Sequence, residues 1–222
     1  MNSSKTLLAI LGSYVIFAIL QSPSYSKIDP SIGAVDVAYV ICSFTLILGP
    51  AAYFGLRVDA SRVKLATRTW RNLPAGIVSF LLPAILAAFV AFLLNAGLSI
   101  LFAKFWIAPT SQSYVLKFTV LDKIANSASA GIWEETVFRL FLLSSTLAFT
   151  GSVLGSVALS NTVFTLLHAV LQQPPYNLPA LTIVFVIGLV YSMCYLRWGL
   201  ESAMACHGTM NLLSMTLGAS LG

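Results

Sequence analysis

Long apolar runs divide this chain and set the solvent in which it can fold. They cover approximately residues 6–21, 32–55, 74–102, 124–149, 152–172, 178–196 and 200–220. A helix of roughly 20 residues crosses the hydrocarbon core of a bilayer. Only 9% of the 222 residues are charged, far below the roughly 25% of ordinary soluble domains. The sequence therefore predicts an all-α protein, a single integral membrane domain over residues 1–222 built as a polytopic transmembrane bundle of about seven helices.

Two parts of the apolar pattern affect the number of crossings. The segment from 103 to 123 mixes aromatic residues with lysines, which is typical of an interfacial or partially re-entrant segment. The first run is long for the core of a signal peptide and lacks a following small-x-small cleavage pattern, so we expect an uncleaved anchoring helix.

The net charge of +5 comes largely from one short loop, whose basic residues are Arg57, Arg62, Lys64, Arg68 and Arg71. Short loops rich in Lys and Arg are retained in the cytoplasm, so we expect the loop from 56 to 73 there, against anionic headgroups of the lipid bilayer. Counting seven crossings from a cytoplasmic N-terminus places the C-terminus outside, unless the segment from 103 to 123 reverses that parity. Nucleic acid is not an expected partner.

The three cysteines, Cys42, Cys194 and Cys206, lie in apolar runs and show no ligand spacing. We expect them to pack as small buried hydrophobes rather than to form disulfides.

The apolar runs of the C-terminal half contain a few ionisable residues, which in lipid are costly and usually functional. His168 and His207 are the two histidines of the chain, and a third run carries Glu134, Glu135 and Arg139. Glu135 and Arg139 are four apart with the acid first, the favoured order for a helical ion pair. Glu134 faces about 100° away and is left unpaired, as a general base or acid requires. The alternative is that both glutamates join an ion-pair cluster that fixes helix packing.

Two more pairs have four-residue spacing. Phe164 and His168 share a helix face, so the ring is expected to wall a pocket beside the imidazole. A lone histidine on an apolar face is more often a core residue bonded to a carbonyl or hydroxyl. His207 and Asn211 form one stripe and can direct hydrogen bonds at one point, as an oxyanion formed at a peptide carbonyl requires. The alternative is a polar clamp between helices.

Three motifs occur in order within successive apolar runs: Glu134-Glu135-x-x-x-Arg139, Phe164-x-x-x-His168 and His207-x-x-x-Asn211. Together they resemble the motifs of the CAAX prenyl protease and bacteriocin-processing (CPBP, or ABI) membrane proteases. The resemblance covers roughly residues 124–215, which we take as the protease motif region. It implies a helical bundle with its active site sunk within the membrane.

The resemblance also implies an activity, endoproteolysis of a peptide or protein substrate at a membrane-proximal site. Glu134 and His168 would activate water, and His207 and Asn211 would stabilise the oxyanion. The other two residues of the first motif would hold that motif in place. We expect an integral protein of a bacterial or archaeal cell membrane. No segment selects among prenylated ends, leader peptides and C-terminal sorting tails as substrates.

Two alternatives remain for this site. Glu134, His168 and His207 can bind zinc and leave a position for water. Because HExxH is absent, and because Asn211 and the second glutamate fit a metal-free site better, we expect no cofactor, with zinc as the alternative. The second alternative is a non-catalytic immunity or regulatory membrane protein that binds a peptide in the same pocket.

Overall fold

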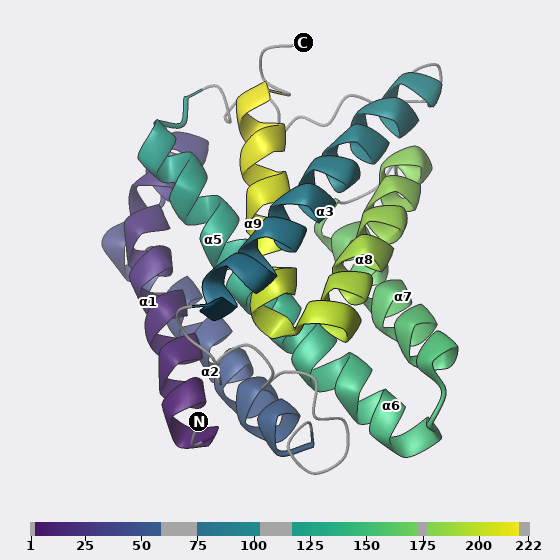
Figure 1. Ribbon diagram of the computed structural model, residues 1–222. Helices are drawn as coiled ribbons and strands as arrows, with labels where there is room; N and C mark the ends of the chain where they lie inside the picture. Colours follow the sequence, from purple (N-terminus) through teal and green to yellow (C-terminus); the bar gives the residue numbers. More distant parts are fainter. Residues whose placement is uncertain (1–2, 59–74, 103–116, 173–176, 218–222) are drawn as a thin grey trace.

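A computed structural model describes residues 3–58, 75–102, 117–172 and 177–217 of this chain. The helices, drawn in Figure 1, are α1 (Ser3–Ile28), α2 (Ala34–Val58), α3 (Ala75–Leu101), α5 (Val120–Glu135), the π-helix η4 (Thr136–Leu143), α6 (Ser144–Thr150), α7 (Val153–Gln172), α8 (Leu178–Trp198) and α9 (Leu200–Leu217). No strand occurs in these ranges.

The predicted polytopic helical bundle is confirmed. Five helices are long and apolar enough to cross a membrane: Ser4–Tyr25, Ala34–Val58, Ser79–Leu101, Val153–Val170 and Leu178–Trp198. The remaining two runs, α9 and the unbroken helical stretch from α5 through η4 to α6, are the ones that carry the motif glutamates, arginine, asparagine and one histidine. The polar residues of these two runs lower their mean hydropathy. Several of these residues, among them Glu135, Arg139 and His207, are buried inside the bundle.

Helix α9 lies at the centre of the bundle and contacts α5, α3 and α8 (Figure 1). Two glycines allow α5 and α9 to approach closely. A Cβ atom at Gly131 would lie 2.9 Å from the Met204 carbonyl oxygen, and one at Gly208 would lie 3.3 Å from that of Ser127. Small residues are the usual means of close helix contact in membranes. This contact brings the end of α5 against the middle of α9.

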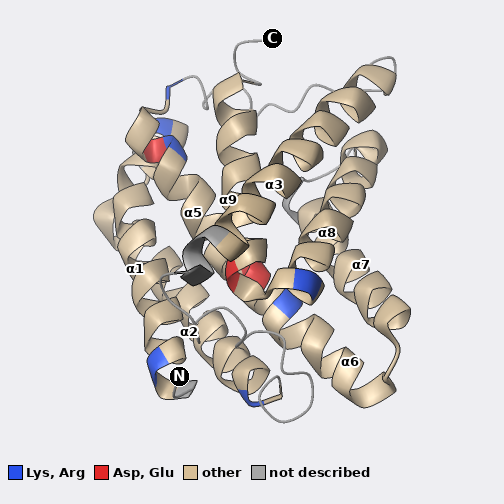
Figure 2. Cartoon of the chain, in the orientation of Figure 1, with Lys and Arg blue, Asp and Glu red and all other residues tan. Residues whose placement is uncertain are grey.

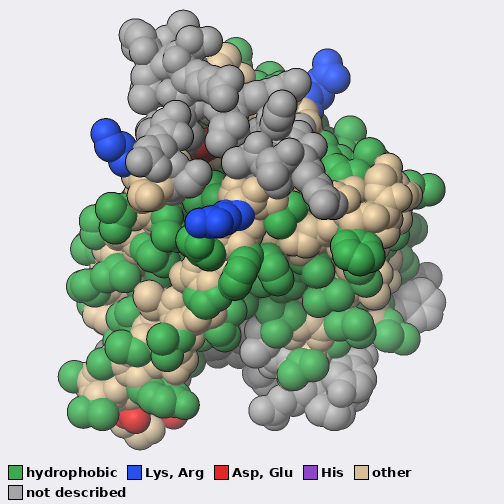
Figure 3. All heavy atoms as spheres, turned by 90° about the horizontal axis from the view of Figure 1, so that it is seen from below, with side chains coloured by type: hydrophobic (Ala, Val, Ile, Leu, Met, Phe, Trp, Pro, Cys, Tyr) green, Lys and Arg blue, Asp and Glu red, His purple; other side chains and the backbone are tan. Residues whose placement is uncertain are grey.

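The outer surface is apolar, as a lipid-facing surface must be. Hydrophobic side chains cover most of the described surface on the one face that Figure 3 shows, and charged residues occupy only a few places on the helices in Figure 2. Leu8, Leu46, Leu86 and Leu154 are among the exposed large hydrophobic residues. The expectation for the cysteines is only partly met: Cys194 and Cys206 are buried and unpaired, but Cys42 is exposed on α2.

Two expectations about the chain's organisation need correction or fall outside the described ranges. The helix expected over about 124–149 is present, but it starts at Val120 and its residues 136–143 form a π-helix. A capping box of Thr119 and Asp122 begins it. Residues 103–116 of the expected interfacial segment, and most of the basic loop, lie outside the described residues; Arg57 is in the last turn of α2.

Interactions of the side chains explain where the π-helix forms. The backbone N–H of Ser144 bonds to the carbonyl of Arg139, five residues back, which widens the turn by one residue. Arg139 is held from outside this helix, by Asn161 on α7 and Gly188 on α8. The wider turn therefore coincides with the residue whose side chain is held by two other helices.

Candidate active site

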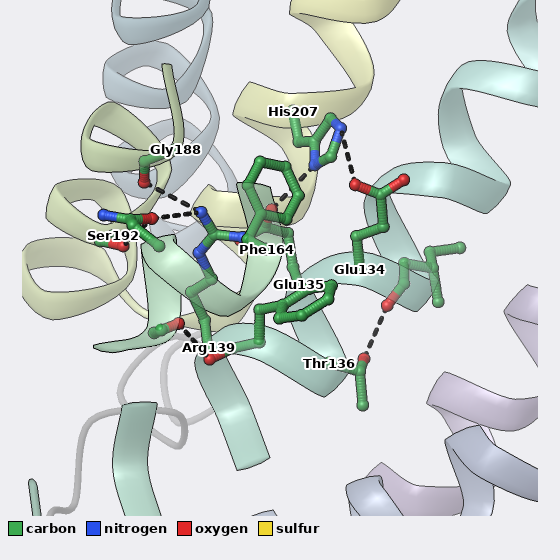
Figure 4. Close-up of polar contacts among 12 residues, drawn as sticks. Glu134, Glu135, Thr136, Arg139, Phe164, Gly188, Ser192 and His207 are labelled. Carbon is green, nitrogen blue, oxygen red and sulfur yellow. Dashed lines mark hydrogen bonds and ion pairs between the residues drawn. The ribbon is translucent and has the colours of Figure 1, made fainter. Parts of the chain in front are cut away.

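The ion pair expected from sequence spacing is formed and fully buried. Arg139 Nη1 lies 3.2 Å from Glu135 Oε1, and neither side chain is exposed. The other guanidinium nitrogen, Nη2, donates to Asn161 Oδ1 at 3.1 Å and to the Gly188 carbonyl at 2.9 Å, and the guanidinium carbon lies 4.6 Å from the centre of the Phe164 ring (Figure 4). The charge of Arg139 is thus neutralised and its side chain is fixed by three helical segments.

Glu134 points away from this pair, toward both histidines. Its Oε2 lies 3.9 Å from His168 Nε2 and 3.8 Å from His207 Nε2. That oxygen is buried and has no hydrogen-bond partner among the described residues. The structure therefore brings together, from α5, α7 and α9, the three groups that the sequence predicts to converge.

The hydrogen bonds of the two rings define which nitrogen carries the proton. His168 Nδ1 lies 2.9 Å from the Phe164 carbonyl oxygen, and His207 Nδ1 lies 2.8 Å from Glu135 Oε1. A carbonyl oxygen or a carboxylate only accepts, so Nδ1 is the donor in both rings. In the neutral rings, both Nε2 atoms then present lone pairs to Glu134.

Three acceptors therefore face one another around one point. A separation of 3.8–3.9 Å is too long for a direct hydrogen bond. A donor between the groups, such as a water molecule, would satisfy them. The arrangement is suited to binding and deprotonating water.

The expected backbone carbonyl bond of a core histidine is present at His168, but it uses only Nδ1. The side chain of His168 is 28% exposed and that of His207 is 5% exposed. His168 is thus the more open side of the site, whereas His207 is enclosed by protein.

Aromatic rings wall the site. Phe164, which the sequence predicts as a wall, is buried, with its ring centre 4.6 Å from that of His168 and 6.3 Å from that of His207. Tyr191 of α8 stacks on His207, with ring centres 4.3 Å apart and planes 14° apart.

Sequence reasoning missed three residues of this region: Asn161, Gly188 and Tyr191. Asn161 was detectable, because it is a polar residue seven positions before His168 in an apolar run and so shares its helix face. Gly188 and Tyr191 carry no charge and belong to no motif. Their contribution depends on how α8 packs, which spacing does not reveal.

Asn211 lies one turn after His207 on α9 and is partly buried. No hydrogen bond from its side chain to another described residue is present. Its expected role beside His207 therefore stays a prediction. The geometry adds a condition for His207: with Nδ1 bonded to Glu135, it can donate from Nε2 only as the imidazolium.

The donor set also bears on zinc. A carboxylate and two Nε2 atoms, each ring bonded through Nδ1 to an acceptor, have the chemistry of zinc ligands. Within the described ranges, however, no group of three or more His, Cys, Asp and Glu side chains is arranged closely enough to hold a metal ion.

Comparison with known protein families gives a match, which covers part of the chain. Residues 116–213 match the family model described as Type II CAAX prenyl endopeptidase Rce1-like. No curated protein and no solved structure matches the chain. The matched region contains all three motifs and therefore Glu134, His168 and His207. Residues 116–213 are therefore similar to the Rce1-like family of type II CAAX prenyl endopeptidases.

Proposed function

We propose that the protein is an intramembrane endopeptidase that hydrolyses a peptide bond near the membrane surface with a water molecule activated by Glu134. The observation that supports this most directly is the buried Oε2 of Glu134, which lacks a hydrogen-bond partner among the described residues and lies almost equally far from two imidazole nitrogens. A buried acceptor of this kind requires a partner in function. The family match to a peptidase supports the same reaction.

The chemistry follows from the acceptors. A water molecule donates one hydrogen to Glu134 and the other to His168 Nε2, which directs its oxygen lone pair at the substrate carbonyl. As the C–O bond forms, Glu134 takes the proton from the water and later gives it to the leaving amine when the C–N bond breaks. The products are a new carboxyl end and a new amine.

His207 and Asn211 stabilise the oxyanion in this proposal. His207 donates from Nε2 as the imidazolium, while its Nδ1–H remains bonded to the Glu135 carboxylate. Arg139 in turn holds Glu135. The first and third motifs are thus coupled through one carboxylate oxygen.

The substrate that we propose is a peptide or protein with a membrane-proximal cleavage site. The family's description names prenylated CAAX ends; leader peptides and C-terminal sorting tails are the other classes that the motifs imply. We place the enzyme in a bacterial or archaeal cell membrane.

Zinc is the alternative to a metal-free reaction, with Glu134, His168 and His207 as ligands and a metal-bound water as the nucleophile. Metal analysis of the purified protein, and its activity after treatment with a strong zinc chelator, separate the two. The metal-free reaction predicts cleavage unchanged by the chelator.

The experiment that tests the function compares the termini of membrane proteins from cells that produce the wild type or Glu134→Gln. Gln keeps the shape of the side chain but cannot accept the proton. We expect new termini only with the wild type. Purified protein in vesicles should then cleave a peptide from that substrate about 10²–10⁴-fold faster than Glu134→Gln.

The matched control is Glu201→Gln, which changes the same residue type in the first turn of α9 and belongs to none of the three motifs. It should cleave like the wild type. Undiminished cleavage by folded Glu134→Gln would overturn the mechanism, and a lack of any difference in termini would favour the non-catalytic alternative, a peptide-binding immunity or regulatory protein.

A further inference from the structure

We infer that Tyr191 is a positioning residue that sets the plane of the His207 ring and so aims Nε2 at Glu134. The inference concerns the same site as the proposed function and rests on it for its catalytic consequence. Tyr191 is on α8, outside all three motifs.

The contact is a parallel stack within the bundle. The rings of Tyr191 and His207 have centres 4.3 Å apart and planes inclined by only 14°. Tyr191 is 2% exposed and His207 is 4% exposed, so neither ring has solvent beside it to allow movement. Phe164 meets the His207 ring edge-on at 6.3 Å and 86°. The imidazole is therefore covered on a face by Tyr191 and bordered by a second aromatic ring.

The hydrogen bond of His207 does not fix its orientation without this stack. The torsion that turns an imidazole about its Cβ–Cγ bond has broad energy minima. The bond from Nδ1 to Glu135 fixes one atom of the ring, and the ring can still tilt about that point. A neighbouring flat surface removes the remaining freedom, because tilting would separate the rings or make them clash. With the plane set, Nε2 lies 3.8 Å from Glu134 Oε2.

Tyr191 is itself held by the network of the first motif. The guanidinium carbon of Arg139 lies 5.6 Å from the centre of the Tyr191 ring. One turn earlier on α8, the Gly188 carbonyl accepts from Arg139. A Cβ atom at Gly188 would lie 2.7 Å from Asn161 Oδ1, so α8 approaches this network closely. Helix α8, which has no motif residue, thus supports both Arg139 and His207.

The two histidines of the chain make a direct test possible, because ¹⁵N-histidine labelling gives only two imidazole signals. His168→Gln assigns the signal of His207. In the wild type, the stack should shift the carbon-bound ring protons of His207 upfield. Tyr191→Phe should keep this shift and Tyr191→Leu should remove it.

The catalytic consequence is measured with the peptide identified through the Glu134→Gln comparison. Misplacing a reacting group by 1 Å costs up to about 100-fold in rate. We expect Tyr191→Leu to lower kcat on the order of 10- to 100-fold with KM little changed, and Tyr191→Phe to restore kcat. A residue that only supports folding would change the amount of folded protein and not kcat per folded molecule.

Tyr195 provides the matched control on the same helix. It is fully buried one turn further along α8, and its hydroxyl lies 2.6 Å from Ser144 Oγ. Tyr195→Leu should lower the Tm while leaving the His207 signals and kcat near those of the wild type. Equal loss of kcat in Tyr195→Leu and Tyr191→Leu would overturn the inference.

A measurement on the wild type keeps the test decisive if Tyr191→Leu does not fold. With protonated tyrosine in a deuterated background, a tyrosine ring should give a nuclear Overhauser effect to His207 that is lost in Tyr191→Phe. Its absence in the wild type would overturn the inference. Because neither spectrum requires turnover, an inactive wild type would refute the proposed function while the spectra still decide whether Tyr191 holds His207.

Discussion

Glu134 and Glu135 are adjacent and chemically identical, yet the bundle gives them opposite surroundings. Glu135 Oε1 accepts from Arg139 Nη1 and from His207 Nδ1, and the side chain is fully buried. Glu134 is 18% exposed, and its Oε2 lies 3.8 and 3.9 Å from two imidazole nitrogens. The rotation of about 100° between neighbouring helix positions is enough to produce this difference. Glu135 therefore has an arginine and an imidazole as partners, whereas Glu134 has a buried carboxylate oxygen with no hydrogen-bond partner among the described residues.

The buried pair of Glu135 and Arg139 predicts that substitutions at the two positions have coupled effects on the free energy of unfolding. Arg139→Met leaves the Glu135 carboxylate buried without its cation, which should cost about 3–5 kcal/mol of unfolding free energy. Glu135→Gln should also destabilise the protein, because it leaves the guanidinium without its carboxylate. The double variant should lose less than the sum of the two, since neither charge remains. Reversible unfolding of the purified variants in detergent micelles measures all three.

Leu140→Ala serves as the reference for that cycle. It removes a fully buried apolar side chain from the same π-helix but leaves both charges of the ion pair in place. Its cost in unfolding free energy should therefore add to that of Arg139→Met, apart from any interaction between the two cavities. Strict additivity of Glu135→Gln and Arg139→Met would contradict the coupling.

Among the elements, the helices were predictable and the π-helix was not. Apolar runs located each described helix, because the length of a bilayer crossing and the exclusion of charge from lipid act directly on the sequence. The π-helix at residues 136–143 contains Arg139, whose side chain contacts Asn161 and Gly188 on other helices. Those contacts join residues 22 and 49 positions apart, and no local pattern encodes them.

In the site, too, local spacing predicted some contacts, whereas others depend on how the helices pack. Four-residue spacing predicted the Glu135–Arg139 pair and the shared face of Phe164 and His168, since helix geometry alone sets both. The convergence of His168 and His207 on Glu134 needed the packing of three helices. Tyr191 carries no charge and no motif, so only the structure reveals its stack on His207.

The contact between α1 and α5 contains a polar cluster at its outer end. Asp122 is buried and accepts from Lys27 and Ser24 of α1 and from Thr119. Burial alone would raise the pKa of this carboxyl, but the hydrogen bonds from Lys27, Thr119 and Ser24 outweigh it and lower the pKa from 3.8 to about 2. The ionised carboxylate therefore helps to hold α1 against the helix that carries Glu134.

This cluster predicts a pH-dependent stability. Because the pKa is lowered on folding, its contribution is complete above pH 3.8 and is lost as the pH falls to about 2. Asp122→Asn should lower the Tm at neutral pH, and the difference from the wild type should shrink across that window. Thermal unfolding in an acid-stable detergent measures it. Asp29→Asn, at an exposed turn, should show a much smaller difference at neutral pH, and a wild-type advantage unchanged at pH 2 would contradict the assignment.

For the whole molecule, the alternation of the helices places the start of α1 and the end of α9 at opposite ends of the bundle (Figure 1). Lys5 and Arg57 lie near helix ends on the side where α1 begins (Figure 1). The sequence between α2 and α3 contains a further four basic residues, Arg62, Lys64, Arg68 and Arg71. Among the described residues, the basic residues on the other side are Lys27, Lys117 and Lys123. The side with more Lys and Arg residues is expected to face the cytoplasm.

This asymmetry predicts that the N-terminus is cytoplasmic and the C-terminus is outside. In bacterial cells, alkaline phosphatase fused after Gly222 should be active and a green fluorescent protein at the same position should be dark. The same reporters inserted between Val58 and Ala75 should give the opposite result. His168 is four residues before the end of α7, on the side where α9 ends, so this orientation turns the more exposed histidine toward the extracytoplasmic face. A fluorescent C-terminal fusion would contradict the seven-crossing topology and would turn His168 toward the cytoplasm.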